Sequence, residues 1–355
     1  MDLFTRCPDC ETEVPAVNRR TFVKVVSIAA AAAATGGVTS LARADQSTKP
    51  APETLVKKLY DSLSPKQKED VCFDWDYKDD RGLLRTHVSN NWNVTDDKTL
   101  NIAGKFFTSD QQDIIHEIFL GLYNPDWHDR IKKQLQDDAG GYGKSQTIAL
   151  FGMPGSGKFE FLMTGRHLTI RCDGDSAEHV AFGGPIFYGH AASGFDEKVG
   201  HPDNVYWHQA KKANKLFQVL DGKQREQALI EIAPPEAKVE FKGKNDIPGL
   251  AVADMSSDQK AHAQEVLKTL LEPYRTSDQH EAMKALNAQG GLDQCRLSFY
   301  RKGANGASLD LGDDGEWDVW RLEGPSFVWH FRGVPHVHVW VNVADDASVP
   351  LNAKA

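Results

Sequence analysis

Two histidines near the C-terminus stand two residues apart in a stretch with the alternating pattern of a β-strand. His336, His338 and Trp340 alternate with valines, so they occupy one face of the strand and the valines occupy the other. A valine face belongs in a core, whereas two imidazole nitrogens at this spacing can reach one metal ion. The stretch therefore predicts a strand whose polar face carries a pair of metal ligands.

Three further histidines complete the candidate metal set. His167 follows a glycine after an alternating apolar segment, as His336 does, and His190 ends another segment of small and apolar residues. His330 stands on the strand before His336, where a turn of three residues would place it opposite His338. For each histidine taken singly, the competing interpretation is a side chain that hydrogen-bonds within the sheet and binds no metal.

The residues around His167 suggest how such a site would act. Arg166 and Arg171 are close to it in sequence, and a guanidinium group can hold an anionic part of a substrate. His167 itself would be a third metal ligand or a general base. Zinc and copper both suit imidazole ligands, and the sequence leaves the choice between these divalent ions open.

A glycine-rich motif at 152–158 matches the pattern G-x-x-x-x-G-K of a phosphate-binding loop. Phe159 stands where such a loop needs Ser or Thr to bind magnesium. The residues after it alternate as in a strand, whereas a phosphate site requires the N-terminus of a helix. We therefore expect a hairpin loop between two strands.

Four predicted helices that start with the same capping pattern precede the strands that would position the histidines. An N-cap residue is followed three positions later by glutamine at Ser64, Thr108, Asp221 and Ser256. Each helical region precedes Phe- and Trp-rich alternating segments, which predicts an α+β fold with a mainly antiparallel sheet. The stretches that start at Thr108 and Ser256 also resemble each other without a gap. Two related α-then-β halves would explain this, and so would the general likeness of good N-caps.

Length and charge limit the classes of function. A chain of 355 residues is long enough for two units of about 150 residues each. We place these halves at 53–204 and 205–355, either separate or packed as one domain. The formal net charge of −9 argues against a nucleic-acid partner, which would require an excess of Lys and Arg.

The N-terminal residues have the features of a twin-arginine (Tat) export signal. Arg19 and Arg20 precede a short apolar run, and an Ala-x-Ala cleavage site ends at Ala44. We expect a signal peptide at 1–44 that is read by the Tat translocase and removed by signal peptidase, followed by a linker at 45–52. The mature protein would be periplasmic or secreted, with no stable membrane span. An uncleaved anchor is the alternative.

Several segments resemble an exported family known only as domain of unknown function 3500. They are residues 165–170, 184–189, 321–325 and 336–340. The resemblance covers most of the chain after the signal, and His167 and His338 match the family's histidines best. It implies export but supplies no activity.

Two hypotheses of function follow from these patterns. The first is a histidine-ligated, metal-dependent enzyme that acts on an extracytoplasmic substrate, with a shallow site where the strands of the two halves meet. The alternative is a non-catalytic exported protein that binds its ligand in a groove lined by Trp and Tyr side chains.

Overall fold

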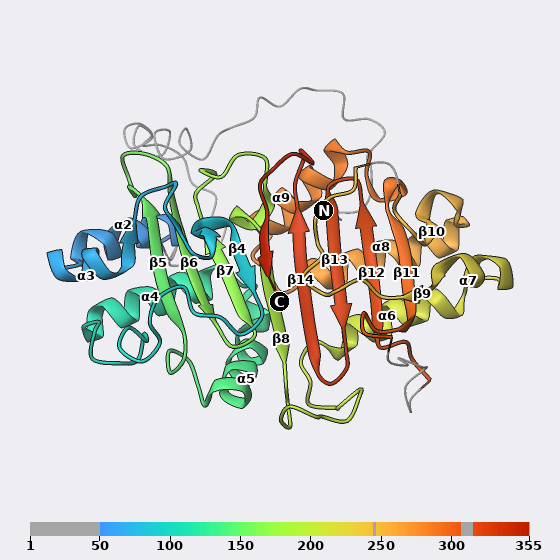
Figure 1. The fold of residues 1–355 in the computed structure, drawn as a ribbon, viewed down its shortest axis with the longest axis horizontal. Helices are drawn as coiled ribbons and strands as arrows, with labels where there is room; N and C mark the ends of the chain where they lie inside the picture. The colour runs from blue at the N-terminus through green and yellow to red at the C-terminus, as the bar shows by residue number, and fades with distance from the viewer. Residues whose placement is uncertain (1–49, 244–245, 307–314, 355) are drawn as a thin grey trace, which may run out of the picture. The chain divides into compact units, whose positions relative to one another are not determined.

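Figure 1 shows the computed structural model, which describes residues 50–243, 246–306 and 315–354. The expected signal peptide at 1–44 lies outside these residues, as does most of the expected linker. In the part of the chain that is described, no helix combines the length and the apolar character needed to cross a membrane.

The main sheet consists of two four-stranded antiparallel meanders that meet edge to edge (Figure 1). The first contains β5 (Thr147–Gly152), β6 (Phe159–Gly165), β7 (Leu168–Cys172) and β8 (Ile186–His190). The second contains β11 (Arg296–Lys302), β12 (Val319–Gly324), β13 (Phe327–Arg332) and β14 (Val337–Val343). Antiparallel pairing of β8 with β14 joins the two meanders into one sheet.

Short strands extend or cover this sheet. At one edge β1 (Cys72–Phe73) runs parallel to β5, and at the other β9 (Leu229–Ile232) runs parallel and β10 (Leu250–Ala251) antiparallel to β11. Two small ribbons pair β2 (Lys78–Asp79) with β3 (Gly82–Leu83) and β4 (His87–Ser89) with β15 (Asn352–Lys354). Val88 and Ala353 of the second ribbon pack against Phe187 and Trp340 of the sheet. This ribbon therefore covers the sheet face that carries Trp340.

A set of four α-helices precedes each meander in the chain. The first set is α2 (Pro52–Ser62), α3 (Pro65–Val71), α4 (Ser109–Gly121) and α5 (His128–Ala139). The second set is α6 (Trp207–Gln218), α7 (Gly222–Ala228), α8 (Ser257–Leu271) and α9 (Thr276–Ala288). In both sets the second helix leads directly into a strand that runs parallel to the first strand of its meander. The predicted α+β class with a mainly antiparallel sheet is confirmed, and residues 50–355 form one compact unit.

All four helix starts predicted from the sequence are capping boxes, at Ser64, Thr108, Asp221 and Ser256. The glutamines that close these boxes also bond to one another in pairs. In the first set Gln67 and Gln111 exchange side-chain hydrogen bonds of 2.8 and 3.2 Å. In the second set Gln224 and Gln259 do the same at 3.0 and 2.7 Å. The same glutamine pair therefore occurs in both helical sets.

The glycine-rich motif at 152–158 forms a hairpin loop, as expected. It joins β5 to β6, and the amide of Met153 donates to the carbonyl of Lys158 across the turn. Lys158 pairs with Glu178 on the surface. No helix begins after the loop, so the geometry of a phosphate-binding loop is absent at these described residues.

Replacing Gln67 by Ala should lower the free energy of unfolding by about 1–3 kcal/mol, because it removes the capping box at Ser64 and the hydrogen bonds from Gln67 to the buried Gln111 and to the carbonyl of Phe106. The matched control is Gln224→Ala, which breaks the equivalent but half-exposed pair and should cost less than about 1 kcal/mol. Urea denaturation of both variants measures the difference. Equal losses would contradict the importance of burial at the first pair.

Candidate metal centre

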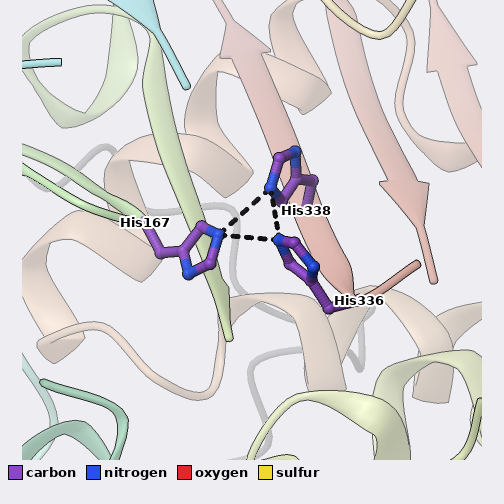
Figure 2. Close-up of side chains that lie close together, drawn as sticks. All are labelled: His167, His336 and His338. Atoms are coloured by element: carbon purple, nitrogen blue, oxygen red, sulfur yellow. Dashed lines mark hydrogen bonds between the residues drawn. The ribbon is translucent and has the colours of Figure 1, made fainter. Parts of the chain in front are cut away.

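Three of the histidines singled out in the sequence meet where the two meanders join, and we call them the histidine triad (Figure 2). His167 lies in the turn between β6 and β7, His336 directly precedes β14, and His338 is on β14. Their Nε2 atoms are 3.1 Å apart in all three pairs. All three side chains are buried, so the site is deeper than the shallow one expected.

The triad lies on the polar face of β14 that the alternating pattern predicts. Val337, Val339, Val341 and Val343 point to the opposite face and are almost completely buried. Trp340 follows the histidines on their own face and packs on Phe187 with ring centroids 5.0 Å apart. The valine face anchors the strand in the core, which fixes the direction of the imidazoles.

Gly189 makes room for the ring of His167. It pairs with His338 in the β8–β14 ladder, so it lies directly beside the triad. A Cβ atom on Gly189 would stand 3.2 Å from the His167 ring and only 2.3 Å from the carbonyl oxygen of Val337. His167 itself has a left-handed backbone with φ of 53°. The tight turn and the missing side chain together allow the first meander to reach β14.

Two carboxylates lie behind the triad. Glu236 accepts a 2.9 Å hydrogen bond from Nδ1 of His338 and a 3.1 Å bond from the indole of Trp340. An oxygen of Asp138 lies 2.9 Å from Nδ1 of His167, although away from the ideal direction of the N–H bond. Carboxylates in these positions favour a proton on Nδ1 and orient the rings, as around metal-bound histidines.

The third ring of the triad is held by the backbone. Nδ1 of His336 donates to the carbonyl oxygen of Phe195 over 2.7 Å. All three Nδ1 atoms therefore face groups that only accept protons, which leaves the Nε2 atoms with lone pairs. Three lone pairs at 3.1 Å from one another repel unless a cation lies between them.

The spacing of the triad fits one metal ion. Three nitrogens 3.1 Å apart can all reach one ion at the zinc–nitrogen bond length of about 2.0–2.1 Å. A site with three protein ligands would leave a fourth position on zinc for water or substrate.

The protonation states also suit a metal site. Burial lowers the pKa of His336 to about 4 and that of His338 to about 3, so both rings are neutral near pH 7. Burial alone would raise the pKa of Glu236, but the hydrogen bond from His338 and its positive neighbours lower this pKa to about 2. The pKa of Asp138 is likewise lowered, against the effect of burial, by its contact with His167. Neutral imidazoles and ionised carboxylates are the forms that bind a divalent ion.

The other two histidines of the candidate metal set lie away from the triad. His190 makes a 3.0 Å contact with Asp137 through Nε2 and accepts a 3.1 Å bond from the amide of Val205 at Nδ1, so both nitrogens are occupied. His330 faces Trp340, not His338, so the expected register was wrong. The reason is that the ladder ends at the pair Arg332–His338, so the turn holds five residues where three were expected.

The two arginines singled out near His167 differ in their surroundings. Arg171 is buried and gives its donors to Glu160 and to the carbonyl groups of Arg85, His87 and Pro185. Its donors are therefore all used in packing β7. Arg171 follows His167 by four residues in the chain. Arg166 is more open, with a side chain that is 40% exposed and lies 3.8 Å from a carboxylate oxygen of Asp138.

Sequence reasoning missed the groups that surround the triad. Asp138 ends a polar helix, and Glu236 lies in a loop, so neither has a pattern that distinguishes it from a solvated carboxylate. Phe195 contributes a backbone carbonyl, which no side-chain pattern reveals. Arg332 is the last residue of β13 and faces His338 across the ladder. The alternating strand pattern, combined with the correct register, would have predicted only Arg332 as a neighbour of the triad.

Comparisons with known proteins agree with the resemblance seen in the sequence. No curated protein and no solved structure matched the chain. A family model did match, over residues 46–338, which include the whole histidine triad. Since this match spans most of the chain, the protein belongs to the family described as "Protein of unknown function (DUF3500)".

Proposed function

We propose that the histidine triad holds a divalent metal ion and that the protein is a metal-dependent enzyme. The observation that carries this proposal is the convergence of three Nε2 atoms at 3.1 Å, each backed by an acceptor at Nδ1. Three histidine nitrogens, with no fourth ligand grouped beside them among the described residues, are a ligand set of catalytic zinc sites, whereas structural zinc sites use four protein ligands.

Zinc suits this site better than copper. Carboxylates hydrogen-bonded to ligating histidines are typical of zinc sites, and Asp138 and Glu236 occupy that position. Electron-transfer copper sites add a cysteine thiolate. In the described part of the chain, the group that could hold a metal contains three histidines and no cysteine. Cys172 is buried in β7.

A zinc ion with three neutral ligands lowers the pKa of a bound water to about 7, which supplies a nucleophile for hydrolysis. The chain's own residues would hold the geometry for that reaction. Asp138 and Glu236 fix the rings and balance the charge of the ion. The deep position of the triad strengthens these electrostatic interactions.

The alternative function, ligand binding in an aromatic groove, has less support. Seven of the eight tryptophans are buried, and Trp75 alone among them is partly exposed. Trp127, Trp320 and Trp329 are among the largest fully buried side chains and belong to the core. They are unavailable to line a groove.

Metal analysis tests the proposal. Protein purified without a histidine tag should contain about one zinc per chain, and His336→Ala and His338→Ala should each lose nearly all of it. His280→Ala, which removes an exposed histidine, is the control and should keep the metal. Circular dichroism shows whether the variants still fold. Wild-type protein that binds no divalent metal at micromolar concentration would refute the proposal.

We further propose that the protein reaches an extracytoplasmic site through the Tat pathway, on the evidence of its N-terminal sequence alone. Lys lacks the planar guanidinium fork, so replacing Arg19 and Arg20 together by Lys should trap the precursor in the cytoplasm. Fractionation and N-terminal sequencing measure this, and the exported product should begin near Asp45. Normal export of the double variant would contradict the Tat assignment.

A further inference from the structure

Arg332 lies beside the histidine triad and shares a partner with it. It pairs directly with His338 in the ladder between β13 and β14. One carboxylate oxygen of Glu236 lies 2.9 Å from Nδ1 of His338 and 3.4 Å from Nε of Arg332. One carboxylate oxygen of Glu236 therefore lies between the guanidinium of Arg332 and the ring of His338.

Two donors of Arg332 make no hydrogen bond to the protein. Its Nε and Nη2 atoms are buried, and Nε has only the 3.4 Å ion pair with Glu236. Arg171 offers a contrast, because Glu160 and three carbonyl groups take up its guanidinium donors. Buried donors without an acceptor are unfavourable, so those of Arg332 call for an acceptor from outside the protein.

Arg332 can also be reached from solvent. Its side chain is 19% exposed and that of Glu236 is 18% exposed, while the triad behind them is buried. Phe195, whose ring centroid is 5.4 Å from that of His336, is 67% exposed, so the triad also lies close to solvent at His336. A ligand that approaches the triad from the side of Arg332 would contact the guanidinium.

We propose that Arg332 binds an oxyanion of the substrate, a carboxylate or a phosphate or sulfate group, next to the metal ion. A guanidinium matches such a group because two parallel N–H donors meet two oxygens. The charge of the site favours an anion, because the summed charge of a divalent ion and Arg332 exceeds that of the carboxylates of Asp138 and Glu236 by one positive charge. This inference rests on the proposed function and extends it by naming an anionic substrate class. It also moves the anion-binding role from Arg166 and Arg171 to Arg332.

Calorimetric titration with inorganic phosphate tests the proposal on zinc-loaded protein. Arg332→Gln should weaken phosphate binding at least tenfold while the zinc content stays at the wild-type value. The matched variant is Arg166→Gln, which removes the other arginine near the triad and should change the affinity less than threefold. Equal affinity in wild type and Arg332→Gln, or a loss confined to Arg166→Gln, would overturn the proposal.

Two further measurements keep the result decisive. If Arg332→Gln loses zinc, Arg332→Lys retains a charge beside Glu236 without the planar fork. Phosphate binding that is at least threefold weaker in this variant supports the proposal, and unchanged binding overturns it. If the wild type holds no zinc, the proposed function fails, and the titration is repeated on the metal-free protein. Phosphate binding that depends on Arg332 would still support the inference, whereas absence of saturable binding would overturn it.

Discussion

The antiparallel pairing of β8 with β14 is the interaction on which the rest of the structure depends. It joins two meanders from opposite halves of the chain and aligns Gly189 with His338. That register brings His167 into contact with histidines that follow it by 169 and 171 residues. A shift by one residue would turn His336 and His338 toward the valine side and dissolve the triad. The core packing of the valines therefore also fixes the positions of His336 and His338 in the triad.

The polar groups behind the triad form a second constraint. Burying imidazoles without a charge is favourable only if each N–H finds an acceptor, and Asp138, Glu236 and a backbone carbonyl supply these. The same acceptors turn every lone pair inward. A site that could hold a cation thus follows from satisfying three buried rings, and Glu236 links this site to the partly exposed Arg332.

Local patterns in the sequence predicted much of this structure. Alternation identified the strand at 336–343 and its two faces, and capping boxes located four helix starts. The register between strands was less accessible, because a turn two residues longer than expected placed His330 opposite Trp340 instead of His338. Asp138 and Glu236 were missed because a carboxylate in a polar segment looks the same whether it faces water or a buried ring. Arg171 seemed available to a substrate, but its partners are distant in sequence and carry no local signal.

The central claim is that three imidazoles share one ion, and X-ray absorption at the zinc edge of the purified protein tests it most directly. The account predicts a first shell of nitrogen and oxygen only, at about 2.0–2.1 Å, with outer-shell scattering from three imidazole rings. A shell containing sulfur at about 2.3 Å, or scattering from fewer than three imidazoles, would contradict it.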